Sequence, residues 1–153
     1  MTEPAPRLSD VPKGAARLGF AGLIPFAAFG LAALLAPEAW AGLARATLAD
    51  YGATILAFMG GCRWGFAAAG LGEGPTVRML ALAVAPSLWA WAALATPDAV
   101  ACLLIALGLA ALLGADMALA RAGGAPAWWP ALRRPLTIGA AISLAVGAAG
   151  AAA

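Results

Sequence analysis

The stretch Asp50-Tyr-Gly-Ala-Thr-Ile-Leu-Ala-Phe-Met-Gly-Gly-Cys-Arg-Trp-Gly-Phe-Ala-Ala-Ala69 decides the fold of this chain. A helix rises about 1.5 Å per residue, so that roughly 20 apolar residues cross the hydrocarbon core of a bilayer. The stretch also contains Arg63, a charge that inside a membrane needs a partner, a wet pocket or access to headgroups. One edge of the helix carries only small side chains, at Ala53, Ala57, Gly61, Gly65 and Ala69. We therefore expect this helix to be the centre of a small membrane bundle.

The composition is that of an integral membrane protein. Hydrophobic residues make up 64% of the chain and charged residues 10%, whereas soluble domains average about 25% charged residues. In 153 residues the apolar runs leave no room for a separate soluble domain. The chain has no histidine, which removes the usual haem ligand, the commonest metal ligand and the usual general base. Cys62 and Cys102 are expected toward opposite faces of the membrane, so we expect no disulfide.

The apolar runs predict an all-α integral membrane bundle of five transmembrane helices, a single domain over residues 15–153 after a polar N-terminal tail at 1–14. The tail is expected to be disordered or to lie on the surface, because it contains three prolines among charged residues. The spans are predicted at about residues 17–36, 50–69, 77–95, 99–119 and 136–153.

Helix-breaking and helix-capping residues predict further features within and between the spans. We expect a kink in the first span near Pro25, and Asp98 as the cap of the fourth span. Residues 37–49 are expected to form a short interfacial helix, and residues 120–135 an interfacial loop. A secretory signal is the alternative for the first run. We reject it, because about 19 apolar residues exceed the roughly 7 to 15 of a signal peptide.

The basic residues predict the orientation, because loops rich in Lys and Arg stay in the cytoplasm. With the N-terminus cytoplasmic and the C-terminus outside, only Arg45 of the nine basic residues lies outside. The other eight are Arg7, Lys13, Arg17, Arg63, Arg78, Arg121, Arg133 and Arg134.

Arg63 and Asp116 are the two charges well inside predicted spans, both in the cytoplasmic third. An unpaired charge there costs about 2.5 to 3.5 kcal/mol on insertion scales, so we expect an ion pair that fixes the register of two helices. Exchanging the two residues is then expected to restore a bundle that either single neutral substitution weakens. Two alternatives stay open: each side chain snorkels to the headgroups, or Arg63 contacts an anion or a quinone headgroup.

Two further sets of residues are candidates for contacts. Small residues predict close helix packing, either within the chain or with another protein, at Gly60, Gly61, Gly65, Ala106, Ala110, Gly114, Gly139 and Gly147. Aromatic and basic residues are expected as interfacial anchors at Trp40, Trp64, Trp89, Trp91, Trp128, Trp129, Arg133 and Arg134. The last four of these could alternatively bind anionic headgroups.

Catalytic and metal-binding patterns are missing from the sequence. It holds no Ser-His-Asp set, no cysteine pair at metal spacing, no phosphate loop after a strand and no paired carboxylates on one helix face. We therefore expect no enzyme activity, no metal, no cofactor and no nucleic-acid partner.

Several segments resemble a known family. The stretch from Tyr51 to Gly65, with its Gly-Gly-x-Arg-Trp-Gly core, resembles uncharacterised small membrane proteins that include eukaryotic transmembrane protein 69 and many bacterial homologues. Matching segments are found at residues 18–26, 85–90 and 128–137. The resemblance implies a multi-pass topology without an established activity, a bacterial-type inner membrane as the location, and Gly60, Gly61, Arg63 and Trp64 as the centre of the family's function.

These observations favour a non-enzymatic accessory, assembly or stabilising subunit of a larger inner-membrane complex, respiratory or photosynthetic, in contact with lipids and other integral membrane proteins. The alternative is a small binding or transport protein for an anionic lipid, a quinone or another amphipath in a pocket around Arg63. A cavity that reaches Arg63 would favour the alternative, whereas a dry contact between Arg63 and Asp116 with an outward face of small residues would favour the accessory role.

Overall fold

The computed structural model describes residues 6–72 and 76–150, and all regular secondary structure within these ranges is helical. The elements are a 3-10 turn η1 (Leu8–Asp10) and the helices α1 (Lys13–Ala21), α2 (Leu23–Leu35), α3 (Glu38–Ala68), α4 (Val77–Ala93), α5 (Asp98–Arg121) and α6 (Trp129–Ala149). With α1 and α2 counted as one interrupted helix, the predicted all-α architecture of five helices is confirmed.

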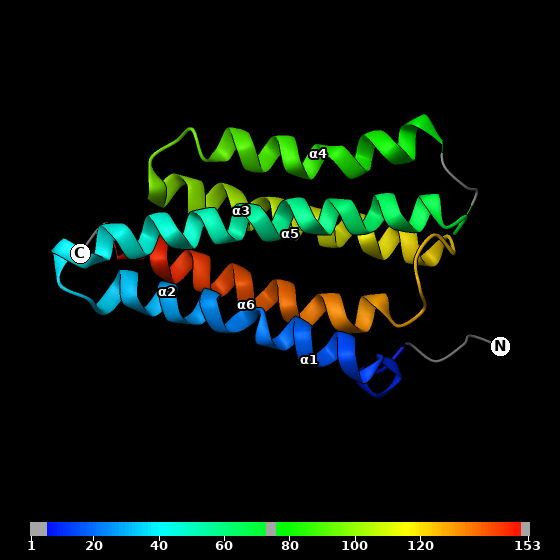
Figure 1. Ribbon diagram of the computed structural model, residues 1–153, viewed down its shortest axis with the longest axis horizontal. Coiled ribbons are helices and arrows are strands. Elements are labelled where there is room, and N and C mark those ends of the chain that lie inside the picture. Colours follow the sequence, from blue (N-terminus) through cyan, green and yellow to red (C-terminus); the bar gives the residue numbers. More distant parts are fainter. Residues whose placement is uncertain (1–5, 73–75, 151–153) are drawn as a thin grey trace.

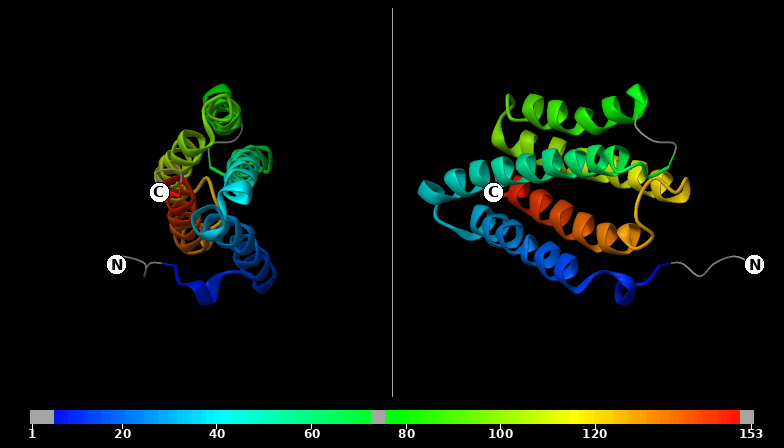
Figure 2. Two further views of the ribbon diagram at one scale, coloured as in Figure 1. Left: turned by 90° about the vertical axis from the view of Figure 1, so that its left-hand side faces the viewer. Right: turned by 45° about the vertical axis from the view of Figure 1, so that its right-hand side comes forward.

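With α1 and α2 in line, the helices run up and down, each antiparallel to the next (Figure 1). An end view shows two layers, with α5 and α6 side by side on one side and α3 with α2 on the other, and α4 packed against α3 and α5 at one edge (Figure 2). Helix α3 contacts α2, α4, α5 and α6, so it occupies the middle of the bundle. The expected central position of this helix is therefore observed.

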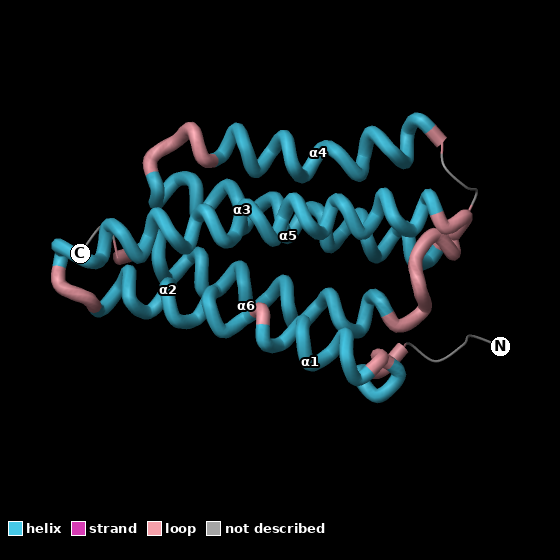
Figure 3. Tube along the Cα trace, viewed as in Figure 1, coloured by secondary structure: helices cyan, strands magenta, loops and turns pink. Residues whose placement is uncertain are grey.

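The first helix is interrupted at Gly22, three residues before the predicted kink site, and Figure 3 shows the short non-helical segment there. Pro25 explains the position. Its ring clashes with the carbonyl four residues earlier, which belongs to Ala21, so the distortion falls in the turn before the proline. The Tyr51 hydroxyl of α3 donates a hydrogen bond of 2.9 Å to the Gly22 carbonyl, which ties the interruption to the bundle.

Helix α3 is continuous over 31 residues, about 46 Å at the usual rise per residue. The prediction of a separate interfacial helix at residues 37–49 is therefore wrong. This segment packs inside the bundle, where Ala44 and Leu48 are buried. Arg45 donates from Nε to the Gly147 carbonyl at 3.0 Å, close to the end of α6, where a cation is favourable.

Two helix starts also differ from expectation. Asp98 is the first residue of α5 and makes no side-chain cap hydrogen bond, although its charge suits the positive end of the helix. The expected interfacial loop at 120–135 ends early, because α6 begins at Trp129. Pro130 is compatible with this start. Backbone N–H groups in the first turn of a helix have no partner within the helix, so the N–H that proline lacks is not needed there. Residues 129–135 therefore belong to the bundle.

One residue of the described N-terminal tail is packed. Val11 is buried against Ala131 and Leu132 of α6, whereas residues 6–10 and 12–14 are exposed, so this part of the tail lies on the surface, as expected. Some predicted features lie outside the described residues: positions 1–5 of the tail, positions 73–75 of the break before α4 and positions 151–153 of the last span.

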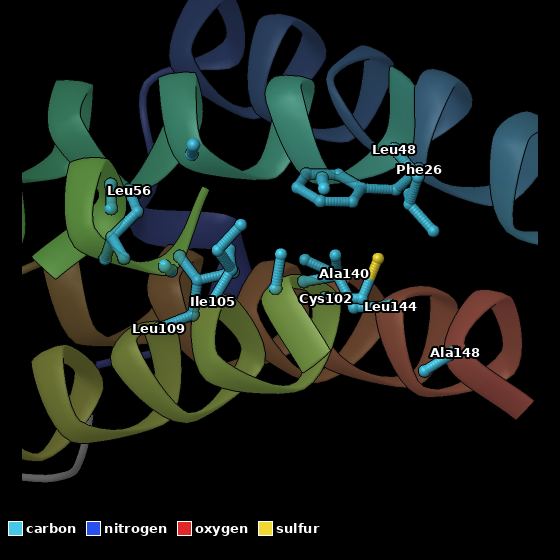
Figure 4. Packing of buried hydrophobic residues seen from close by; sticks show 14 of the residues in the cluster. Phe26, Leu48, Leu56, Cys102, Ile105, Leu109, Ala140, Leu144 and Ala148 are labelled. Atoms are coloured by element: carbon cyan, nitrogen blue, oxygen red, sulfur yellow. The ribbon is translucent and has the colours of Figure 1, made fainter. Parts of the chain in front are cut away.

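The main core lies between α2, α3, α5 and α6. Figure 4 shows its side chains meeting between the two layers, among them Phe26, Leu48, Leu56, Ile105 and Leu144. Backbones approach closely beside this core. A Cβ added at Gly30 would lie 2.7 Å from the Ser143 carbonyl oxygen, which brings α2 against α6. Such approaches provide the van der Waals contact that holds helices together in a membrane.

Large apolar side chains cover the outside of the helices. Exposed examples are Leu31 on α2, Phe58 on α3, Leu88 on α4, Leu103 on α5 and Ile142 on α6. Soluble monomers expose only limited apolar patches. Among the described residues, two helical segments are clearly long and apolar enough to cross a membrane, Lys13–Leu35 and Asp98–Arg121. This surface suits contact with lipid.

Adjacent glycines in α3 provide a test of the helix packing. A Cβ at Gly60 would collide with the Ala83 carbonyl of α4, whereas a Cβ at Gly61 meets nothing within 4 Å. We expect Gly60→Ala to destabilise the protein by about 1 to 3 kcal/mol through overpacking. Gly61→Ala is expected to leave stability unchanged or to raise it by up to about 1 kcal/mol. Apparent melting temperatures in a mild detergent measure both, and equal effects of the two substitutions would contradict this packing.

Candidate functional site

A buried carboxylate lies at the end of the bundle where α3 and α5 end and α6 begins. Asp116 of α5 has no exposed surface. Its Oδ1 accepts a hydrogen bond of 2.7 Å from Nη1 of Arg63 on α3. The structure therefore brings together the two charges that the sequence places inside spans. Both side chains are buried, so neither of them snorkels to the surface.

A second arginine shares the same carboxylate. Arg133 of α6 donates from Nε to Oδ2 of Asp116 at 2.9 Å. The indole Nε1 of Trp129 donates to the same oxygen at 3.2 Å. The Arg133 guanidinium carbon also lies 5.8 Å from the centre of the Trp129 ring, within the range of a cation–π contact. We call Arg63, Asp116, Trp129 and Arg133 the charge cluster.

The charge cluster corrects two sequence predictions. Trp129 and Arg133 are buried, so they are not interfacial anchors. Their roles were missed because Gly123, Gly124, Pro126 and Pro130 indicated a loop. Once α6 is known to start at residue 129, the spacing of Trp129, Arg133 and Thr137 by four residues places all three on one helix face. That spacing is the signal that could have found them.

The second arginine also changes the exchange experiment. An exchange of Arg63 and Asp116 would place an arginine at position 116 beside Arg133, which would lose its carboxylate. The exchange is therefore expected to fail although the ion pair exists.

Polar groups remain unsatisfied around the charge cluster. Arg63 Nε, Arg133 Nη2 and Thr137 Oγ1 are buried without a hydrogen-bond partner. An arginine side chain stays protonated in proteins, so two guanidiniums and one carboxylate leave a net charge of +1. Buried polar groups are normally paired, and each exception calls for an explanation.

An apolar cavity of about 330 Å³ adjoins this region. Its walls come from α1, α2, α3, α5 and α6, and the residues that line it include Leu18, Phe26, Met59, Cys62, Leu109 and Leu136. Arg133 and Thr137 also line the cavity, whereas Arg63 does not. The predicted pocket around Arg63 therefore lies instead beside its neighbour in the charge cluster, Arg133.

The predicted packing residues fall into two groups. Gly60 packs against Ala83 and Pro86 of α4, Gly139 against Leu23 of α2, and Gly147 against Leu48 of α3. The second group is exposed, at Gly61, Gly65, Ala110 and Gly114, whereas Ala106 is half-buried against the main core. A Cβ added at Gly61, Gly65 or Gly114 would meet nothing within 4 Å.

The other predicted anchors lie nearer the surface. Trp40, Trp64, Trp91 and Arg134 are exposed, and Trp128 is half-buried. Trp89 is partly exposed, and its Nε1 donates to the Leu104 carbonyl of α5 at 2.8 Å. Trp89 thus joins α4 to α5. Of the two cysteines, Cys62 is half-buried and Cys102 is buried, and both are free. No group of three His, Cys, Asp or Glu residues within the described ranges could hold a metal ion.

Comparison with known proteins gives a family and a relative. A family model described as "Protein of unknown function (DUF3429)" matches residues 11–149. Transmembrane protein 69 of Xenopus tropicalis is 41% identical over 140 residues, which cover 90% of this chain and 54% of that protein. The chain thus spans about half the length of the curated relative that it matches. No solved structure shows a significant match.

The charge cluster makes a specific prediction about stability. Asp116→Asn leaves two buried guanidiniums without a carboxylate, so we expect a loss of about 3 to 5 kcal/mol and a lower apparent melting temperature. Arg63→Gln leaves the neutral pair of Arg133 and Asp116 and is expected to cost less. Asp50→Asn, at an exposed carboxylate of α3, is the control and is expected to change little. Thermal unfolding in detergent measures the loss of stability in the three variants. A loss in Arg63→Gln as large as that in Asp116→Asn would contradict the prediction.

Proposed function

From the premise that this chain belongs to the DUF3429 family of proteins of unknown function, we propose that it is a non-enzymatic accessory protein of a larger membrane complex. Its similarity to a transmembrane protein and its apolar surface support a location in the membrane. In this proposal all five helices cross a bacterial inner membrane with the N-terminal end in the cytoplasm. The basic residues gathered at one end of the bundle support this orientation.

The observation that carries the proposal is the outward face of α5. Between residues 110 and 118 its exposed side chains are all small, at Ala110, Ala111, Gly114, Ala115 and Ala118. A groove of about 440 Å³ between α4 and α5 adjoins this face and is lined by apolar residues that include Leu82, Trp89 and Leu107. We call this surface the α5 face.

The chemistry of the α5 face favours a helix over lipid. Lipid chains pack equally well against large apolar side chains, so small residues gain nothing from contact with lipid. A second helix does gain, because small residues let two backbones approach and increase their van der Waals contact. The direct, buried contact between Arg63 and Asp116 supports the same role, since both side chains of this ion pair are used within the bundle itself. The proposed occupant is therefore a transmembrane helix of another integral membrane protein.

Purification of the tagged protein in a mild detergent tests this proposal. We expect a second integral membrane protein to remain bound in constant proportion. Gly114→Leu places a bulky side chain on the α5 face. It is expected to lower the recovery of the partner protein roughly tenfold, which corresponds to a loss of about 1.4 kcal/mol in binding free energy.

The matched control is Gly42→Leu. Gly42 is also an exposed helical glycine with nothing within 4 Å, but it lies on α3. Recovery of the partner is expected to stay unchanged in this variant. Equal recovery with Gly114→Leu, or purification of the chain alone or only with a second copy of itself, would contradict the proposal.

A further inference from the structure

The cavity beside the charge cluster combines an apolar wall with two polar side chains. Arg133 and Thr137 are each 3% exposed and lie one turn apart on the same face of α6. Each has a polar atom without a partner, Nη2 of Arg133 and Oγ1 of Thr137. Since both residues line the cavity, they place two polar side chains together on a wall that is otherwise mostly apolar.

The hydroxyl of Thr137 differs from three others in the helices. Those of Thr47, Thr54 and Ser143 donate to the carbonyl four residues earlier, at 2.8 Å in Thr47 and 2.9 Å in Thr54 and Ser143. That local bond satisfies a hydroxyl in an apolar environment. Thr137 does not make it, and its buried hydroxyl, in a residue that lines the cavity, is left without a partner.

The net charge of the charge cluster indicates the charge that a ligand in the cavity would carry. Arg63 and Arg133 share one carboxylate, so the charge cluster keeps one positive charge that no described side chain balances. A buried charge is costly until it is paired. A monoanion whose oxygen atoms reach Arg133 and Thr137 would neutralise the charge cluster and satisfy both unpartnered groups.

The size and lining of the cavity indicate the rest of the ligand. A volume of about 330 Å³ lies at the lower end of the range of roughly 300 to 1,000 Å³ for ligand pockets. The remaining lining side chains are almost all apolar. This space suits a single hydrocarbon chain better than a lipid with two chains.

We propose that this cavity is a binding site for a single-chain amphipath with a monoanionic headgroup, whose oxygen atoms accept hydrogen bonds from Arg133 and Thr137. A long-chain carboxylate and a lysophospholipid with one phosphodiester charge share this chemistry. The site is independent of the α5 face, because the cavity is lined mainly by α1, α2, α3 and α6.

Cys62 provides a direct measurement of occupancy, because it lines the cavity, whereas Cys102 is fully buried and does not. The experiment follows alkylation of the purified full chain by N-ethylmaleimide in dodecyl maltoside, read by intact mass. Oleate and lysophosphatidylglycerol are the anionic probes, and oleyl alcohol and decylubiquinone are the neutral ones. Cys62→Ala is expected to abolish the labelling, which assigns the signal to Cys62.

We expect at least one anionic probe to slow the alkylation of Cys62 about tenfold at saturation, and the neutral probes to have little effect. The comparison of oleate with lysophosphatidylglycerol identifies the headgroup. Equal protection by oleyl alcohol, protection by decylubiquinone alone, or no protection by any probe would overturn the proposal.

Thr137→Val tests the polar contact without changing the charge cluster. The loss of a hydrogen bond to a charged headgroup is expected to weaken the protection by the anionic probe roughly tenfold. Thr54→Val is the matched control, because the Thr54 hydroxyl bonds within its own helix and does not line the cavity. An unchanged affinity in Thr137→Val would overturn the assigned headgroup position.

Discussion

The bundle depends on one buried carboxylate. Asp116 of α5 accepts hydrogen bonds from Arg63 of α3 and from Arg133 and Trp129 of α6, so three helices meet at a single side chain. Apolar packing alone tolerates small rotations of one helix against another, because the attraction has no direction. A buried ion pair tolerates them poorly, since a charge turned away from its partner would remain in an apolar environment. The charge cluster therefore fixes the rotation and the register of α3, α5 and α6 at one end of the bundle.

The other two helices are held by close contact. Gly30 brings α2 against the backbone of α6 at Ser143, and Gly60 brings α3 against α4 at Ala83. Helix α4 has one further polar tie, the bond from Trp89 to the Leu104 carbonyl. In a membrane such packing contributes through van der Waals contact, which needs small side chains at the crossing points. The glycines at these crossings are therefore matched to specific partners, whereas Gly61, Gly65 and Gly114 have none within the bundle.

Periodicity and composition predicted much of this fold. The apolar runs gave the all-helical class and the order of the helices, and the depths of Arg63 and Asp116 placed them close together. Local signals failed where tertiary packing opposed them. Glycines and prolines at 123, 124, 126 and 130 indicated a loop, although α6 accommodates Pro130 and Pro135 and so brings Trp129 and Arg133 inside. Residues 37–49 indicated an interfacial helix because Trp40, Leu43 and Thr47 lie near one side and Glu38 and Arg45 elsewhere. Arg45, however, bonds to the Gly147 carbonyl, a partner 102 residues away in the chain.

The composition of the charge cluster connects the fold to the cavity. To fix the register of α3 and α5, a neutral pair of one arginine and one aspartate would suffice, and Arg63 with Asp116 already provides it. Arg133 adds a buried positive charge that shares this carboxylate, and an unbalanced buried charge lowers stability. Natural sequences break the rule of fully paired buried groups mainly at functional sites. The extra charge lies at the wall of an apolar cavity, one turn from a hydroxyl that has no partner. The unbalanced positive charge and the unpartnered hydroxyl are thus at the same place. One anionic headgroup would neutralise the charge and accept a hydrogen bond from the hydroxyl.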